Sequence, residues 1–144
     1  MFLLPNESVF YSIEKAIKTY RRLAQNELAK AFNDITIDQA LILIFIANNP
    51  KLNQAEISEL IFKDRGSVTR MIELLVKNNY LSREIHHLDR RKFKLDVTKK
   101  GEIALHKITA IVAENRSVAL ENITKKQTGS LQQTLNQIIT NCSK

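Results

Sequence analysis

The sequence contains one cysteine, three glycines and two prolines, and it contains no tryptophan. A single cysteine excludes an intrachain disulfide and a zinc site built from several cysteines of one chain. β-Sandwiches and barrels need a tight turn after each short strand, and glycine and proline form many of these turns. Their scarcity disfavours both all-β architectures and favours a largely helical fold.

Long apolar segments are also missing. The longest apolar run, residues 40–47, has eight residues, whereas a membrane-spanning helix needs about 20. Residues 1–5 lack the basic start and the apolar stretch of a signal peptide. We therefore expect a cytoplasmic protein with no membrane partner.

The motifs of common enzyme classes are absent as well. The sequence has no glycine-rich phosphate-binding loop, no motif that pairs a nucleophile with a base, and no His-Glu-x-x-His helix. With three histidines and one cysteine, few residues remain from which a catalytic or metal site could be built. We expect no enzyme activity, no cofactor and no metal, so the sequence predicts a binding protein.

The charge that is present has one dominant sign. Lysine and arginine number 22 against 15 aspartates and glutamates, which gives a net charge of +7. Residues 51–101 hold twelve of the basic and seven of the acidic residues, and so five of the seven excess charges. Such an excess favours a polyanionic partner, either nucleic acid or a membrane surface. A basic middle module framed by nearly neutral packing helices is predicted.

The first part of the chain is predicted to be helical. Residues 6–33 form one long helix because apolar residues recur every three or four positions, and Asn6 is a candidate for its cap. Thr36, followed three residues later by a glutamine, has the spacing of a capping box and begins a second helix that ends near Asn48. The apolar run at 40–47 would also suit a buried strand, but the cap and the stop favour a helix.

Two shorter helices separated by three residues are predicted next. Asn53 repeats the capping-box spacing and begins the first of them. Asp64 caps the second, at about 65–78, which ends at two asparagines that tolerate a left-handed cap. The inward stripe of this second helix consists of Val68, Met71, Ile72 and Leu75.

After residue 79 the apolar periodicity changes from helical to alternating. Residues 80–85 and 92–97 alternate apolar and polar side chains, which is typical of half-buried strands. The polar, basic segment 86–91 connects them, so a β-hairpin with a charged tip is predicted. Thr98 then begins a helix at about 99–121, and Thr124 begins the last one.

This order of elements predicts a winged helix-turn-helix. A helix of this motif enters the major groove and brings its N-terminal residues to the base edges, while basic hairpin residues reach phosphates or the minor groove. Either feature alone is common in small helical domains, and basic hairpin residues are often only solvated. Their adjacency and the local positive charge favour DNA binding. The candidate major-groove residues are Arg65, Ser67, Thr69 and Arg70.

Three segments resemble the MarR (multiple antibiotic resistance regulator) family. Residues 89–91, Asp-Arg-Arg, followed by 95–101, Leu-Asp-Val-Thr-Lys-Lys-Gly, resemble the wing signature of that family. Residues 64–70 resemble its recognition helix, and residues 36–39 resemble the start of its second helix. Asn79 stands where the family usually has glycine, and asparagine can still adopt the left-handed cap.

The resemblance implies a homodimer whose first and last helices interlock and whose two modules bind a pseudo-palindromic operator in double-stranded DNA. Arg91 would enter the minor groove, oriented by Asp89. Arg90 and Lys92 would lie near phosphates or support the tip. The terminal helices are more apolar than a small module needs for its own core, which independently favours a partner surface.

Members of the family also often bind small phenolic or aromatic acids in a cleft beside the dimer helices. A small aromatic or anionic effector is therefore a candidate partner. Its candidate ligand residues are Tyr20, Arg21 and Phe45, although nothing in the sequence itself distinguishes them from ordinary core or surface residues.

Together these observations predict a mainly α fold with a small β-hairpin wing. Residues 35–98 form the winged helix-turn-helix DNA-binding module of a single MarR-like domain, 1–144, and residues 1–34 and 99–144 form dimerisation helices. The predicted function is a homodimeric, sequence-specific transcription regulator, and specifically a ligand-responsive repressor. The alternative is a winged-helix module for protein–protein contact that does not bind DNA.

Overall fold

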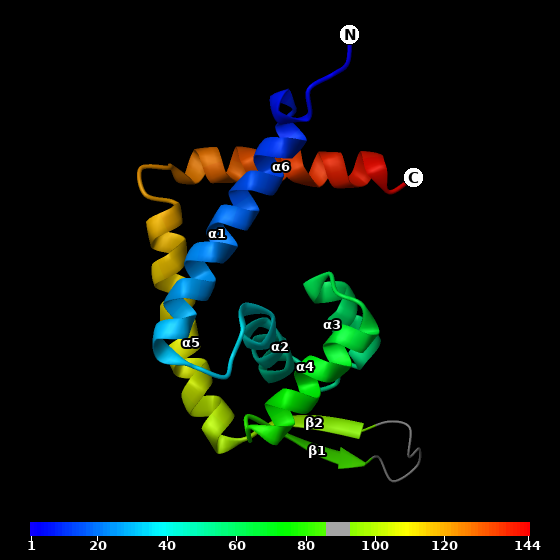
Figure 1. The fold of residues 1–144 in the computed structure, drawn as a ribbon, viewed down its shortest axis with the longest axis vertical. Helices are drawn as coiled ribbons and strands as arrows, with labels where there is room; N and C mark the ends of the chain where they lie inside the picture. Colours follow the sequence, from blue (N-terminus) through cyan, green and yellow to red (C-terminus); the bar gives the residue numbers. More distant parts are fainter. Residues whose placement is uncertain (86–92) are drawn as a thin grey trace.

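The computed structural model spans residues 1–144 and describes residues 1–85 and 93–144. The described elements are six α-helices, one 3-10 turn and one hairpin of two strands (Figure 1). In chain order they are η1 (Pro5–Glu7), α1 (Val9–Ala31), α2 (Ile37–Asn48), α3 (Gln54–Ile61), α4 (Arg65–Lys77), β1 (Leu81–Ile85), β2 (Phe93–Val97), α5 (Lys99–Ala119) and α6 (Lys125–Cys142). The predicted mainly α fold with a small hairpin is confirmed.

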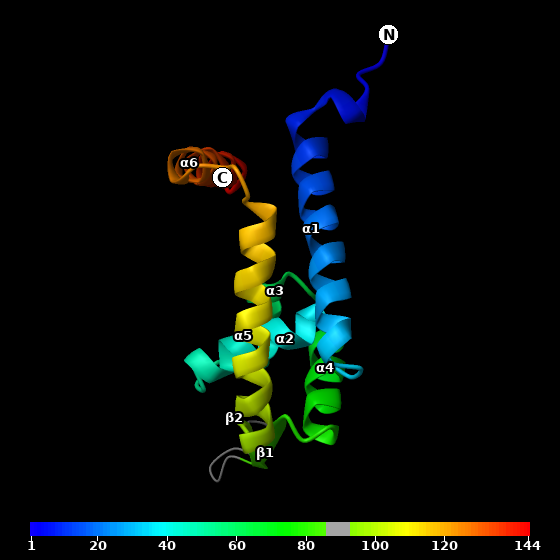
Figure 2. The same cartoon turned by 90° about the vertical axis from the view of Figure 1, so that its left-hand side faces the viewer.

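The helices divide into a clustered module and a long arm. α2, α3, α4 and the hairpin gather around one another, while α1 and α5 run side by side away from them (Figures 1 and 2). α6 crosses α1 in Figure 1, but the view in Figure 2 separates them, and α6 turns away from the far end of α5. The arm thus holds both ends of the chain at a distance from the module.

The core lies in the module and is centred on α2. Ile42, Leu43 and Ile46 of this helix are almost completely buried, and α2 contacts α3, α4, α5 and β2. A helix that is surrounded on most sides needs apolar residues on most sides, which explains the apolar run at 40–47. The rest of the fully buried side chains come from the elements around it: Ile57, Val68, Ile72, Leu75, Leu81 and Ile108.

Most helix starts follow the predicted caps. Thr36, Asn53 and Thr124 each form a capping box, and Thr98 caps α5 through the Gly101 N–H. The predicted start of the first helix at Asn6 is wrong. Residues 5–7 instead form a 3-10 turn, and extended backbone at residue 8 places the Ser8 hydroxyl 3.2 Å from the Phe10 amide nitrogen, where it caps α1.

The arm, which we take to include α6 as well as α1 and α5, has many apolar side chains that this chain does not cover. α6 has no buried residue, and apolar side chains on three helices and their connection are at least 44% exposed. They are Val9, Phe10, Tyr11, Ile17, Val118, Leu120, Ile123, Leu131 and Ile139. Exposed apolar side chains that recur along these helices are typical of a protein–protein interface.

Candidate nucleic-acid interface

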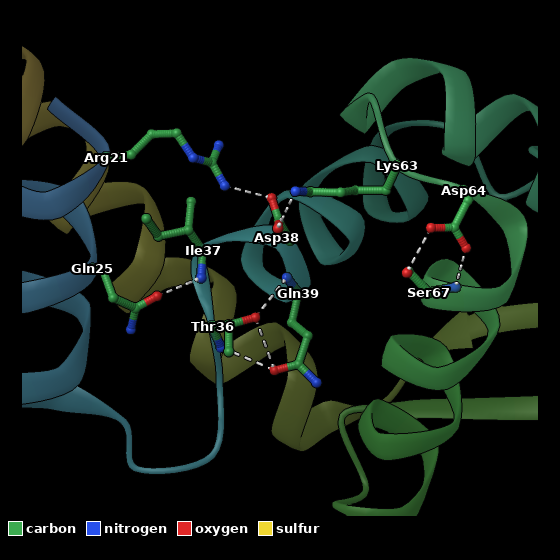
Figure 3. A network of polar contacts seen from close by, with 9 residues as sticks. All are labelled: Arg21, Gln25, Thr36, Ile37, Asp38, Gln39, Lys63, Asp64 and Ser67. Carbon is green, nitrogen blue, oxygen red and sulfur yellow. Dashed lines mark hydrogen bonds and ion pairs between the residues drawn. The ribbon is translucent and has the colours of Figure 1, made fainter. Parts of the chain in front are cut away.

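The N-terminus of α4 is held by the carboxylate of Asp64. Its Oδ1 accepts a hydrogen bond from the Ser67 amide at 2.8 Å, and its Oδ2 accepts one from the Ser67 hydroxyl at 2.9 Å (Figure 3). The bond from the Ser67 amide is the main reason that the pKa of Asp64 is lowered from its ordinary value. The ionised cap fixes the first turn of α4 and complements its helix dipole.

Two cations project from this fixed helix. Arg65 and Arg70 are exposed, whereas Val68 and Ile72 on the opposite side are buried. Among the residues that the structure describes, neither arginine forms an ion pair. Both guanidinium groups are therefore available to an external acceptor such as a phosphate or a guanine edge.

The hydroxyls of the other two predicted groove residues already have partners within the chain. The Ser67 hydroxyl is used in the Asp64 cap. The half-buried Thr69 hydroxyl lies 2.8 Å from the Arg65 carbonyl oxygen and 2.9 Å from Gln54 Oε1 on α3. Reading of bases by Ser67 and Thr69 stays a prediction, and the contacts give both residues a role in holding α4.

The contact between Gln54 of α3 and Thr69 of α4 leaves one buried donor to be accounted for. Its Nε2 is buried without a partner among the described residues, while a single hydroxyl hydrogen of Thr69 faces two acceptors. With the Gln54 amide rotated by 180°, Nε2 donates to the Thr69 hydroxyl, and that hydroxyl donates to the Arg65 carbonyl oxygen. In that orientation the pair joins the two helices without competition for one hydrogen.

The turn between α3 and α4 contains an exposed aromatic residue that sequence reasoning missed. Phe62 has φ 59° and ψ 40°, the left-handed conformation, and it is 91% exposed. A residue with a β-carbon pays about 1–2 kcal/mol for this conformation. The sequence did contain a signal for this feature: a phenylalanine stands in the three-residue turn, where glycine or asparagine is usual.

A polar cluster joins this turn to the arm. Asp38 Oδ1, at the start of α2, accepts a hydrogen bond from Arg21 Nη2 of α1 at 2.7 Å, and its Oδ2 lies 4.0 Å from Lys63 Nζ (Figure 3). The Gln25 side chain of α1 also accepts a hydrogen bond from the Ile37 amide at 3.1 Å. Because Asp38 is only 16% exposed, it links α1, α2 and the turn before α4 in a partly desolvated site.

The predicted wing is described only at its base. β1 and β2 pair antiparallel, with Leu81 opposite Val97 and Glu84 opposite Lys94. Lys94 is exposed and Leu95 is buried, as the alternation predicts. The four predicted wing-tip residues, Asp89, Arg90, Arg91 and Lys92, lie outside the described residues, so their contacts stay predictions.

The three candidate effector residues do not meet in one described hollow. Tyr20 lines an open hollow of about 480 Å³ between α1 and α5, together with Lys15, Leu23 and Ala119. Arg21 is paired with Asp38, and Phe45 packs partly against the core. Effector binding by these residues stays a prediction.

Two further observations concern the described ranges 1–85 and 93–144. They contain no group of three or more histidine, cysteine, aspartate or glutamate side chains arranged to hold a metal ion. None of their helices combines the length and the apolar character that a membrane span requires.

Residues 33–92 match the sequence model of the MarR family. The transcriptional regulator SarZ of Staphylococcus epidermidis is 27% identical over an alignment of 125 residues, with 82% of this chain and 82% of SarZ covered. SarZ of Staphylococcus aureus is 30% identical over 69 residues, 48% of this chain and 47% of that protein.

Solved structures share the fold over nearly the whole chain. A MarR variant from Escherichia coli in complex with operator DNA has a TM-score of 0.83 at 22% identity, with 95% of this chain and 99% of that one covered. Bordetella bronchiseptica BpsR, described with regulation of its DNA binding by 6-hydroxynicotinic acid, also has a TM-score of 0.83, at 14% identity, with 96% and 97% covered. The match of residues 33–92, the curated relatives and the shared winged-helix fold all point to the MarR family of transcription regulators.

Proposed function

We propose that this chain is a homodimeric, sequence-specific DNA-binding repressor whose recognition helix is α4. The observation that carries the proposal is the pair of exposed arginines, Arg65 and Arg70, on a helix whose N-terminus is fixed by Asp64. A rigid helix end can present side chains to base edges with little loss of conformational entropy. The excess positive charge of residues 51–101 supplies the attraction to phosphates.

Within this proposal the four predicted residues of α4 have two tasks. Arg65 and Arg70 contact bases or phosphates in the major groove. Ser67 and Thr69 line the same helix end and, through their contacts with Asp64 and Gln54, hold it in place. Asp89, Arg90, Arg91 and Lys92 form the wing tip, where Arg91 enters the minor groove and Asp89 orients it.

The second copy of the chain covers the apolar arm. Residues 1–34 and 99–144 serve as dimerisation helices, and residues 35–98 form the DNA-binding module. A two-fold axis between two arms places two α4 helices in symmetric positions, which suits a pseudo-palindromic operator. The match to a MarR protein solved with operator DNA supports this arrangement.

An effector and a cellular location complete the proposal. A small aromatic or anionic compound binds beside the dimer helices, near Tyr20, Arg21 and Phe45, and changes the affinity for DNA. The BpsR structure, described with 6-hydroxynicotinic acid, supports this class of ligand. The protein acts in the cytoplasm, where its DNA lies, and has no catalytic activity.

Selection of bound duplexes from random DNA tests the proposal. We expect an enriched pseudo-palindrome with half-sites about one helical turn apart. Affinity should fall steeply with salt between about 50 and 200 mM, because several phosphates are neutralised on binding. Arg91→Ala should weaken binding strongly while sedimentation still shows a dimer. A dimer that enriches no duplex at any salt concentration would contradict the proposal and favour the protein–protein alternative.

A further inference from the structure

Phe62 ends α3 as its left-handed cap, with its N–H donating to carbonyl oxygens of the last helical turn, but the fold does not cover its side chain. The described residues contain three non-glycine positions with positive φ: Phe62, Asn79 and Asn122. Asparagine adopts this conformation readily, whereas a bulky residue such as phenylalanine adopts it at a cost in free energy. Burial does not compensate for the strain, because the side chain of Phe62 is 91% exposed. Folding therefore explains the left-handed cap at position 62, but it does not explain why an exposed phenylalanine occupies the position, whereas a binding role does.

The position of Phe62 places it beside the base-reading end of α4. Two residues separate it from Arg65, the first residue of that helix, so the two Cα atoms are at most about 10 Å apart. The neighbouring Lys63 directs its amine toward Asp38 and away from this end (Figure 3). The phenyl ring is therefore the large apolar group that the turn presents next to the exposed Arg65.

The chemistry of the ring selects one feature of DNA. A phenyl group cannot donate or accept the hydrogen bonds that distinguish most base edges. The apolar group in the major groove is the 5-methyl group of thymine, which phenylalanine can contact. We propose that Phe62 contacts a thymine methyl group in each half-site and so contributes to sequence specificity. This inference rests on the proposed DNA-binding function.

The test removes each half of the contact separately. The DNA partner is the duplex enriched by selection, in which each thymine in turn is replaced by deoxyuridine, a change that deletes only the methyl group. The protein variants are Phe62→Gly and Phe62→Asn, which both suit the left-handed backbone and remove the ring. Leu74→Ala, which shortens a 45% exposed apolar side chain in the C-terminal half of α4, is the control.

We expect the wild type to lose about fourfold in affinity per half-site at one particular thymine, the effect of one buried methyl group. Both Phe62 variants should bind the thymine duplex more weakly and should lose nothing further on the deoxyuridine duplex. The Leu74 variant should keep the full methyl effect. Thermal unfolding should show that the Phe62 variants are at least as stable as the wild type, because the backbone strain is relieved.

The possible failures are distinguishable. If the wild type binds no duplex, the proposed function is wrong. If the wild type binds its selected site but shows no methyl effect, or if both Phe62 variants keep the full methyl effect, DNA binding stands and the role of Phe62 is overturned.

Discussion

The backbone of Gly101 in α5 lies directly against the carbonyl oxygen of Tyr80, at the junction of α4 and β1, and a β-carbon at this position would overlap that oxygen. The same carbonyl accepts a hydrogen bond from the Thr98 amide at 3.1 Å. The Thr98 hydroxyl also donates to the Asn79 carbonyl oxygen. The first turn of α5 is thus docked onto the residues that follow α4, so the module and the arm share a rigid joint.

Gly101→Ala should destabilise the protein by about 1–3 kcal/mol, because the added methyl group meets backbone and cannot be accommodated by a side-chain rotation. Gly129→Ala is the matched control, since none of the described residues of this chain comes within 4 Å of its β-carbon position in α6. That control should be neutral or stabilising by up to about 1 kcal/mol, because alanine is the better helix former. Urea unfolding of both variants measures the difference. Equal stabilities would show that the close contact between Gly101 and Tyr80 does not stabilise the protein.

Asp38→Asn should weaken the connection between the arm and α4. The variant loses the charge that pairs with Arg21 and faces Lys63, so we expect a loss of about 2 kcal/mol in unfolding free energy. The affinity for DNA should fall by more than the increase in unfolded protein explains, because α4 is less firmly oriented in the variant. Calorimetry and binding titrations measure the two effects.

Glu27→Gln is the control for that variant. It removes the Glu27–Lys30 pair, 2.8 Å apart on the exposed side of α1, and such pairs contribute about 0–1 kcal/mol. Identical behaviour of the Asp38 and Glu27 variants would mean that Asp38 is an ordinary surface charge.

The parts of this fold that the sequence predicted well depend on local signals. The caps at Thr36, Asn53 and Asp64 act within three residues, so spacing alone identifies them. The cap of α1 was misplaced because Asn6 and Ser8 are both good caps. The backbone that follows Pro5 decided between them.

The candidate site was only partly predictable, because only some of its features follow from local sequence signals. Exposed arginines near the start of a capped helix follow from periodicity. The Arg21–Asp38 contact joins residues 17 positions apart on two helices, and the Thr69–Gln54 contact joins residues 15 apart. Such contacts depend on how the helices pack, and no local pattern encodes that packing. The left-handed conformation of Phe62 opposes the preference of its residue type, so propensity pointed away from it.

Tyr80 makes the stability of the folded protein fall at alkaline pH. The pKa of Tyr80 is raised from 10.0 to about 12. Burial is the largest cause, and the hydrogen bond that the phenol donates to Asp34 at 2.8 Å is the second. Because the folded state favours the protonated phenol, its contribution to stability is fully present below pH 10 and is lost between about pH 10 and 12. The tyrosinate absorbance that disappears in Tyr80→Phe should titrate near pH 12. A midpoint near 10 in the folded protein would contradict this.

Arg70→Ala should distinguish base reading from phosphate contact. If Arg70 reads a base, the variant should lose about 1–3 kcal/mol on the selected site and much less on unrelated duplexes. Lys77→Ala is the matched control, because it removes one exposed cation at the far end of the same helix. The loss of affinity in this control should be small and equal on all DNA sequences. The slope of log affinity against log salt concentration should fall by at most the amount that corresponds to about one phosphate contact. Competition titrations at several salt concentrations measure both. A uniform loss for Arg70→Ala would assign that residue to the phosphate backbone and leave Arg65 as the arginine of α4 that reads bases.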